Sequence, residues 1–205
     1  MAKAAWKKFP YPDKTYDYAG AALKKNWGAL HRGDCEPFPD EAWVKKTIEA
    51  HPKLDPKMTP AKAADALQAA WRAYHSGDFA GAQEQGEALG PLGFNVANKA
   101  ANIYATYLET DDNRQLDIFQ QSAARAEKLQ AIAKDFPNAF YFHASALGRY
   151  GQGISVAKAL AMGLGGKIKA SLDKALALAP DHAEAHIALG AYNAEVVAKV
   201  GGLVA

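Results

Sequence analysis

The stretch from Ala175 to Gly190 contains the end of one helix, a stop signal and the start of another helix, and it constrains the fold more than any other part of the chain. An apolar stripe with helical spacing leads to Pro180, which cannot continue a helix and disfavours the α conformation of the residue before it. Asp181 follows as a typical N-cap. The same signals recur at Phe136–Ala139, and Pro137 and Pro180 are 43 residues apart. A recurring helix-turn-helix unit explains this spacing better than coincidence.

Composition supports a helical chain. Apolar residues make up 49% of the sequence, and much of this share is alanine, which favours closely packed helices over strands. A length of 205 residues fits a single continuous helical array. The formal net charge is only +2, from 24 basic and 22 acidic residues scattered along the chain, so we expect no nucleic-acid partner. The sequence therefore predicts an all-α protein.

Residues 1–58 differ from the rest because they hold six of the ten prolines and three of the four tryptophans. We expect this segment to form an N-terminal aromatic, Pro-rich arm with two helices. Asp13 is predicted to cap the first helix, which ends at Gly33, and Asp40 to cap the second, which Pro52 closes. The tryptophans are interpreted as core that packs the arm across the first repeat, in preference to a ligand cage.

The repeats begin at Thr59, a predicted N-cap followed by Pro60 at the first helical position, where a missing N–H costs nothing. Gly77 and Asp78 predict a tight turn, because glycine accepts the left-handed conformation at a helix end and aspartate caps the next helix. A small residue at Ala82 lets the two antiparallel helices approach closely.

Three further predicted caps divide the array of residues 59–205 into repeated units. The caps are Asn95, Asn138 and Asp181, and the units are 59–92, 95–136, 138–179 and a half unit, 181–205. The first helix of the third unit is expected to be long, from Phe140 to Gly163. The half unit ends in an apolar run, which leaves two alternatives open: the natural chain continues, or this end packs on a second copy as a homo-oligomer.

Gly77-Asp78-Phe79-Ala80-Gly81-Ala82 resembles the turn signature of the tetratricopeptide repeat (TPR). The segments 147–155, 165–169 and 172–197 resemble the divergent TPR proteins that accompany bacterial TRAP-type transporters. The resemblance covers about residues 59–205. It implies a TPR-like helical hairpin solenoid with a right-handed superhelix. It also implies a non-enzymatic module, without a cofactor, that binds a protein segment or an apolar small ligand between its helices.

In such arrays the first helices of successive units line a concave face that binds partners. The candidate groove residues by repeat register are Trp71, Tyr74, His75, Asn102, Thr106, Arg149 and Gln152. For Trp71 and Tyr74, burial under the arm is an equal alternative to exposure. We expect the groove to bind a protein or peptide partner. The alternative is that the array carries an apolar small ligand, with the glycine-containing helix from Phe140 to Gly163 opening a channel beside Tyr150.

Motifs for other chemistry are incomplete. The segment 163–167 is similar to a phosphate loop, but Ala161 stands where that motif requires glycine and Ile168 where it requires serine or threonine. His182 and His186 have the spacing of two zinc ligands, but Ala183 stands next to His182 where the metalloprotease motif requires glutamate, so both histidines are interpreted as structural. We therefore expect no metal, no cofactor and no enzymatic activity.

The single cysteine, Cys35, excludes an intramolecular disulfide, and the Arg32-Gly33-Asp34 tripeptide before it is interpreted as chance rather than as an adhesion motif. The N-terminus lacks the apolar region of a signal peptide, and no stretch of 18 apolar residues occurs. We expect a soluble, cytoplasmic protein without a membrane span, or a periplasmic protein if a leader precedes the natural chain.

Overall fold

Several helices begin at a side chain that accepts a hydrogen bond from the backbone amide three residues later. The computed structural model describes the backbone of residues 6–204 and the side chains of residues 6–198. The capping residues Asp40, Thr59, Asp78 and Asp111 begin α2 (Glu41–Ala50), α3 (Pro60–His75), α4 (Phe79–Ala88) and α6 (Asp112–Ile132). The first three of these caps are as predicted. Each satisfies an amide that has no partner within its helix.

The other elements are helical as well. They are η1 (Lys14–Tyr16), α1 (Ala22–Leu30), η2 (Pro52–Leu54), η3 (Gly90–Gly93), α5 (Phe94–Tyr107), α7 (Pro137–Gln152), α8 (Val156–Ala161), α9 (Leu164–Leu178) and α10 (Ala183–Val204). Between residues 6 and 204 there is no strand. The protein is therefore all-α, as its composition predicts.

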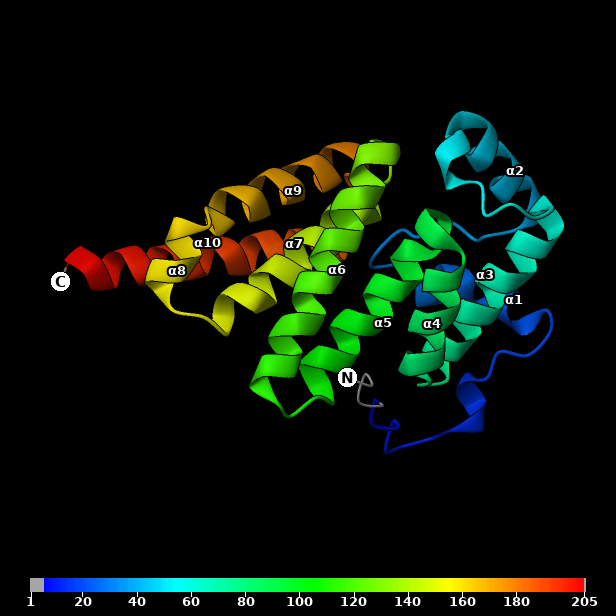
Figure 1. Cartoon of the computed structure of the whole chain (residues 1–205), viewed down its shortest axis with the longest axis horizontal. Coiled ribbons are helices and arrows are strands. Elements are labelled where there is room, and N and C mark those ends of the chain that lie inside the picture. The colour runs from blue at the N-terminus through cyan, green and yellow to red at the C-terminus, as the bar shows by residue number, and fades with distance from the viewer. Residues whose placement is uncertain (1–5, 205) are drawn as a thin grey trace.

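The helices pack in chain order, as Figure 1 shows from α3 to α10. Each of α3 to α6 packs against the next helix, α7 packs against α9, and α9 packs against α10. In addition, α3, α5, α7 and α10 contact one another in succession. The buried apolar residues form clusters along the array, and the arm contributes Leu23 and Trp27 to one of them and Val44 and Leu54 to another.

Two predicted caps are wrong. Asp13 accepts a hydrogen bond from Thr15 N, but it caps only the short η1, whereas α1 begins at Ala22 without a side-chain cap. At α10, the residue that accepts from Ala185 N is His182, through Nδ1 at 3.1 Å, rather than Asp181. A neutral imidazole nitrogen can accept this bond as a carboxylate does, and the same ring makes a tertiary contact that Asp181 could not make.

Asn95 and Asn138 are also not caps. Each is the second residue of its helix, α5 or α7, and each is buried. Gly93 and Phe136 stand at the N-cap positions instead, and neither contributes a side-chain cap. The two amide side chains are turned toward the arm, so a tertiary contact has displaced the local capping role.

The long helix predicted from Phe140 to Gly163 is wrong as well. In the structure α7 ends at Gln152, and Ser155 caps a separate short helix, α8, by accepting a hydrogen bond from Lys158 N. Gly163 then adopts a left-handed conformation, φ +63°, immediately before α9. Glycine takes this conformation without a steric penalty, so the chain reverses here at little cost.

The arm packs along more of the array than the first repeat. Trp27 is buried and its ring lies edge-on to Trp71, with ring centroids 5.6 Å apart. Trp6, however, stacks on Tyr104 of α5 at 4.1 Å, and Trp43 lies 6.3 Å from Phe136, at the turn between α6 and α7. The interpretation of Trp27 as core is confirmed, while the other two tryptophans are partly buried against later units.

Small residues set the distance between α4 and its neighbours. Ala82 is fully buried, as predicted for the close approach of α3 and α4. A Cβ added to Gly93 would lie 2.2 Å from the carbonyl oxygen of Gly86, so only glycine permits this contact. Gly77 ends the preceding turn at φ +87°, which also agrees with the sequence.

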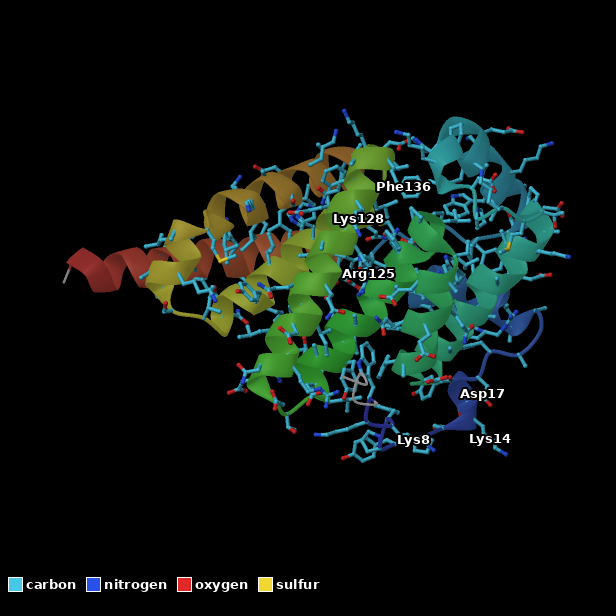
Figure 2. The ribbon with its side chains drawn as sticks, viewed as in Figure 1. Lys8, Lys14, Asp17, Arg125, Lys128 and Phe136 are labelled. Atoms are coloured by element: carbon cyan, nitrogen blue, oxygen red, sulfur yellow. The ribbon has the colours of Figure 1, made fainter. Side chains whose placement is uncertain are left out.

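A buried arginine ties three helices together in the middle of the array. Arg125 of α6 (Figure 2) donates through Nε to Asn98 Oδ1 of α5 at 2.9 Å and through Nη1 to Glu87 of α4. These charge-assisted bonds join helices of two successive units. No helix among residues 6–204 is both long and apolar enough to cross a membrane.

Candidate functional site

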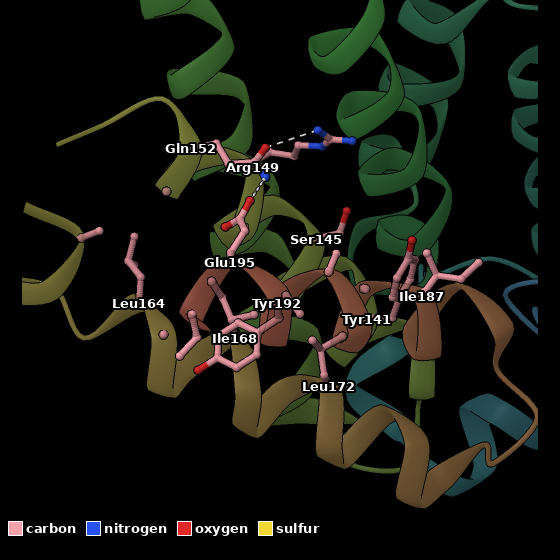
Figure 3. Close-up of a pocket in the computed structure, with 18 of the residues that line it drawn as sticks. Tyr141, Ser145, Arg149, Gln152, Leu164, Ile168, Leu172, Ile187, Tyr192 and Glu195 are labelled. Atoms are coloured by element: carbon pink, nitrogen blue, oxygen red, sulfur yellow. Dashed lines mark hydrogen bonds between the residues drawn. The ribbon is translucent and has the colours of Figure 1, made fainter. Parts of the chain in front are cut away.

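A cavity of about 480 Å³ lies among α7, α8, α9 and α10, and is called the ligand cavity below. Its lining is mainly apolar, as Figure 3 shows. Among the side chains that line it are Leu164, Ile168, Leu172, Ile187 and Tyr192. Cavities of this size and character are typical of sites for small apolar molecules.

The sequence makes the cavity by placing small residues at helical spacing on two facing helices. Ala144, Gly148 and Gly151 lie on one side of α7, and Ala188 and Ala191 lie on α10. A Cβ added to Gly148 would meet no atom within 4 Å, so the space in front of this residue is open. The cavity is therefore present because side chains that would fill it are missing.

The short helix α8 forms an exposed rim of the ligand cavity. Val156 and Leu160 line the cavity, and Leu160 is 70% exposed. On α10, Ile187 also lines it and is 73% exposed. Large aliphatic side chains on two elements thus stay in contact with water around one opening, and an apolar ligand would cover them.

Polar side chains line the ligand cavity at its two ends, and Ser145 lies between them (Figure 3). At one end Arg149 Nη1 donates to Gln152 Oε1 at 3.3 Å, and Gln152 Nε2 donates to Glu195, as the dashed lines in Figure 3 mark. At the other end lie Tyr141 and Glu184. Burial, together with the charge of Glu184, raises the pKa of the Tyr141 phenol above its usual value. An apolar molecule with a polar group at one end fits this arrangement.

A second cavity, of about 310 Å³, lies on the other side of the Arg149 and Gln152 side chains. Thr106 of α5 lines it, together with residues at the start of α6. The structure thus brings together three of the seven groove residues predicted from the sequence. Arg149 and Gln152 line both cavities.

The other four predicted residues do not line either cavity. Trp71 is buried against the arm, as one of the two alternatives anticipated. The ring of Tyr74 is partly buried, and Lys99 Nζ lies 5.9 Å from its centroid. Asn102 is buried, and its Nδ2 donates to the carbonyl of Phe142 at 3.5 Å.

His75, the remaining predicted residue, contacts the arm directly. His31 Nδ1 lies 3.0 and 3.1 Å from the two carboxylate oxygens of Asp34, which can only accept, so Nδ1 carries the proton. Its Nε2 then accepts from His75 Nε2–H at 3.2 Å. Burial lowers the pKa of His75 to about 3 and that of His31 below its usual value, so both rings are neutral near pH 7.

Residues 31–36, called the arm loop, cover the surface formed by α3, α5, α7 and the start of α10, which is called the inner face. In Figure 1 the blue segment between α1 and α2 passes behind α5 toward α7. Asp34 is fully buried and its carboxylate accepts from Lys99 Nζ of α5. Its carbonyl accepts from Asn138 Nδ2 of α7 at 2.9 Å, and Gly33 O accepts from Glu184 N of α10 at 3.0 Å.

Glu36 is the second acidic residue of the arm loop that the inner face holds. Its carboxylate accepts from Asn95 Nδ2 at 3.1 and 3.2 Å and from Asn138 Nδ2. Asn138 Oδ1 in turn accepts from His182 Nε2–H at 2.8 Å. His182 therefore orients the amide that binds both Glu36 and the backbone of Asp34, and the network reaches α10.

The two acidic residues of the arm loop are in different electrostatic states. Burial opposes ionisation of Asp34, but the hydrogen bond from His31 and the charge of Lys99 outweigh it and hold the pKa of Asp34 well below its usual value. Despite its burial, Lys99 has a raised pKa because Tyr74 and two carboxylates surround its ammonium. Burial, followed by the charge of Asp34, raises the pKa of Glu36 to about 7.

Sequence reasoning missed this network. A signal for it was present, since Asn95 and Asn138 occupy the same register, the second position of successive first helices. We interpreted both as caps, because asparagine is a common N-cap. Nothing local indicates that Asp34 lies near Lys99, which is 65 residues away.

The remaining motifs have structural explanations. Gly163 precedes α9, and the following residues of the segment similar to a phosphate loop lie within that helix. His186 Nε2 contacts Pro180 O at 2.8 Å, so the two histidines have separate partners. In the Arg-Gly-Asp tripeptide the aspartate is buried, and Cys35 is an exposed free thiol. Among the described residues no three potential ligands group around a metal position.

Comparisons with known proteins add no identification to this geometry. The chain was compared with protein-family models, with curated proteins and with solved structures, and none of the three comparisons produced a match.

Proposed function

We propose that this protein is a binding module that carries an apolar small ligand in the ligand cavity. The observation that supports the proposal best is the open, mainly apolar cavity of about 480 Å³ among α7, α8, α9 and α10. The exposed aliphatic side chains around its opening fit the same function, because a ligand that covers them removes apolar surface from water. Between the two ligand classes expected from the sequence, the cavity favours the small molecule.

We further propose that the array is a TPR-like solenoid with a right-handed superhelix. Packing of the helices in chain order, with α3, α5, α7 and α10 in contact along one side, supports this arrangement. The Gly77–Ala82 turn supports it too, with a glycine in the left-handed conformation and a buried Ala82. The proposed function is non-enzymatic, since the titratable groups of the inner face bind one another.

The test of the ligand proposal is binding of the neutral apolar dye Nile red, together with native mass spectrometry of the purified chain. Gly148→Leu places a side chain in the open space of the ligand cavity. We expect this variant to bind Nile red at least tenfold more weakly than the wild type. We also expect any molecule that copurifies with the wild type to be absent from the variant.

Gly166→Leu is the matched control. Gly166 is also a helical glycine with no atom within 4 Å of an added Cβ, but it is exposed and does not line the cavity. This variant should bind the dye as the wild type does. Equal binding by all three proteins, or no binding by any, would contradict the proposal.

A second candidate function is binding of a protein partner on the inner face. The arm loop motivates it, because this segment lies outside any helix and already contacts four helices. Chemical crosslinking of the full chain with an identified partner tests the idea. Crosslinks should map to α3, α5 and α7, and crosslinks confined to α9 would contradict it.

A further inference from the structure

The inner face holds two carboxylates of the arm loop in a way that suits a ligand from another molecule. We propose that Asn95, Lys99 and Asn138 form a binding site for an acidic segment of a partner protein, and that the arm loop is a built-in occupant which such a segment replaces. This inference rests on the second candidate function, protein-partner binding, and is independent of the ligand cavity.

The donors of the site match an acid-any-acid sequence. Lys99 Nζ binds the Asp34 carboxylate, and the Nδ2 groups of Asn95 and Asn138 bind the Glu36 carboxylate, two residues further along. A carboxylate accepts charge-assisted hydrogen bonds from both ammonium and amide N–H groups. The three side chains come from two successive first helices, so the array itself sets the distance between the two carboxylate positions.

The site also binds peptide backbone, which distinguishes a protein segment from an isolated small acid. The carbonyl of Asp34 accepts from Asn138 Nδ2 at 2.9 Å, and the carbonyl of Gly33 accepts from Glu184 N at 3.0 Å. The site therefore contacts both the backbone and the side chains of a short turn, which Cys35 N closes by donating to His31 O at 2.9 Å.

The arm loop does not satisfy the site completely. Asn95 is buried, and among the described side chains its Oδ1 is one of the buried polar atoms that make no hydrogen bond. A buried acceptor without a donor costs free energy, which a ligand with an N–H group at this point would recover. The occupant from the same chain is thus not the best ligand that the site can bind.

Replacement of the arm loop exchanges similar contacts. The ammonium of Lys99 and the amides of Asn95 and Asn138 would pair with the carboxylates of the incoming segment, so these three buried donors keep an acceptor. Release also relieves a backbone penalty, because Cys35, between the two acidic residues, is held at φ +52° although it has a side chain. A glycine at this position of a partner segment would avoid the same penalty.

The test uses the full-length chain and a fluorescein-labelled peptide with the sequence of residues 29–38, with serine in place of cysteine. The double variant Asp34→Asn/Glu36→Gln replaces both carboxyl groups of the arm loop with amides of the same shape, and binding is measured at pH 8, above the pKa of Glu36. By fluorescence anisotropy, we expect the variant to bind the peptide at least tenfold more tightly than the wild type does. A peptide with Asn and Gln at the two acidic positions should bind at least tenfold more weakly than the acidic peptide.

Asp65→Asn/Glu84→Gln is the matched control, because both residues are exposed and the net charge changes equally. It should bind like the wild type. Should the first variant fail to fold, hydrogen exchange on the wild type decides: excess acidic peptide should speed exchange of the amides of residues 31–36. Unchanged exchange, or peptide binding that persists without the two acids, overturns the proposal.

Failure of the proposal that the arm loop is a built-in occupant can be distinguished from failure of the second candidate function. If an identified partner crosslinks to the inner face but its affinity is unaltered by Asp34→Asn/Glu36→Gln, the built-in occupant is wrong and the second candidate function stands. If the partner crosslinks elsewhere, the second candidate function itself is wrong.

Discussion

The inner face and the ligand cavity are two surfaces of the same helical array that differ in how they are filled. On the inner face, charged and amide side chains pair with the arm loop and are buried. In the ligand cavity, small residues leave an apolar space with aliphatic side chains exposed at its rim. A substitution that removes one partner on the inner face should therefore destabilise the fold. A substitution in the ligand cavity should weaken only the binding of a ligand.

The largest effect is expected for Lys99→Met, which removes the cation that compensates the buried Asp34 carboxylate. A buried charge without its partner typically costs about 3 to 5 kcal/mol of unfolding free energy. Urea denaturation followed by circular dichroism measures this loss.

The exposed ion pair of Lys169 and Asp173 supplies the control. Lys169→Met should cost less than about 1 kcal/mol, because solvent screens exposed pairs. If the two lysine variants lose equal stability, the inner face is not held by its charges, and the contrast between the two surfaces fails.

The second effect is a pH dependence of stability that arises from Glu36 on the inner face. Glu36 has a pKa of about 7 in the folded protein against an ordinary value of 4.5. The folded state therefore binds the proton more tightly, and this contribution is complete below pH 4.5 and is lost as the pH rises through 7. The loss is on the order of 3 kcal/mol.

Glu36→Gln resembles the protonated carboxyl at every pH and should abolish this loss. The free energy of unfolding, measured from pH 4.5 to 8, should fall in the wild type relative to the variant by that amount. Asp34 has a lowered pKa and contributes stability above its ordinary value of 3.8 in both proteins, so the difference between them isolates Glu36. Parallel pH profiles would show that Glu36 is not protonated on folding.

The third prediction separates binding from stability at the ligand cavity. Ile187 is 73% exposed at the cavity, so Ile187→Ala should change the unfolding free energy by less than about 0.5 kcal/mol. The same change should weaken Nile red binding several-fold. Leu67→Ala, in the core, should instead cost about 2 to 5 kcal/mol and leave the dye affinity unaltered. A stability loss at Ile187 similar to that at Leu67 would mean that the cavity is closed in solution.

The smallest effect is expected for Arg149→Glu. Arg149 is exposed and lies between the two cavities, away from the arm loop. Unfolding should change by less than about 0.5 kcal/mol, and acidic-peptide binding to the Asp34→Asn/Glu36→Gln background should not change. A large loss of peptide affinity would place the peptide at the cavity rather than on the inner face.

Several elements were predictable because their signals are local. Asp40, Thr59 and Asp78 cap helices at the positions that the sequence indicates, since a cap depends only on residues within one turn. The helix expected from Phe140 to Gly163 was not predictable in this way. Its apolar spacing continues past Gln152, but Ser155 begins a new helix there, and periodicity alone does not detect such a break.

The candidate sites were predicted less well than the helices. The register placed Thr106, Arg149 and Gln152 around one cavity, but it also selected Trp71, which the arm buries. Register identifies the side of a helix that faces the next unit. It does not indicate which other segment covers that side.

The expectation of a second copy at the apolar C-terminus falls partly outside the described residues, because side chains from residue 199 onward are not described. Ile187 and Val197 of the same helix are exposed. The first of them lines the ligand cavity, so part of this apolar surface belongs to the proposed ligand site.

The sequence by itself determined that the chain is all-α and where α2, α3 and α4 begin, because capping, proline and glycine effects act over a few residues. Only the tertiary structure decided that the arm loop lies on the inner face, since its partners are 65 and 104 residues away in the chain. The same holds for the cavity. A glycine such as Gly148 leaves open space only if the helices opposite it do not fill that space. This depends on how α7, α8, α9 and α10 pack together.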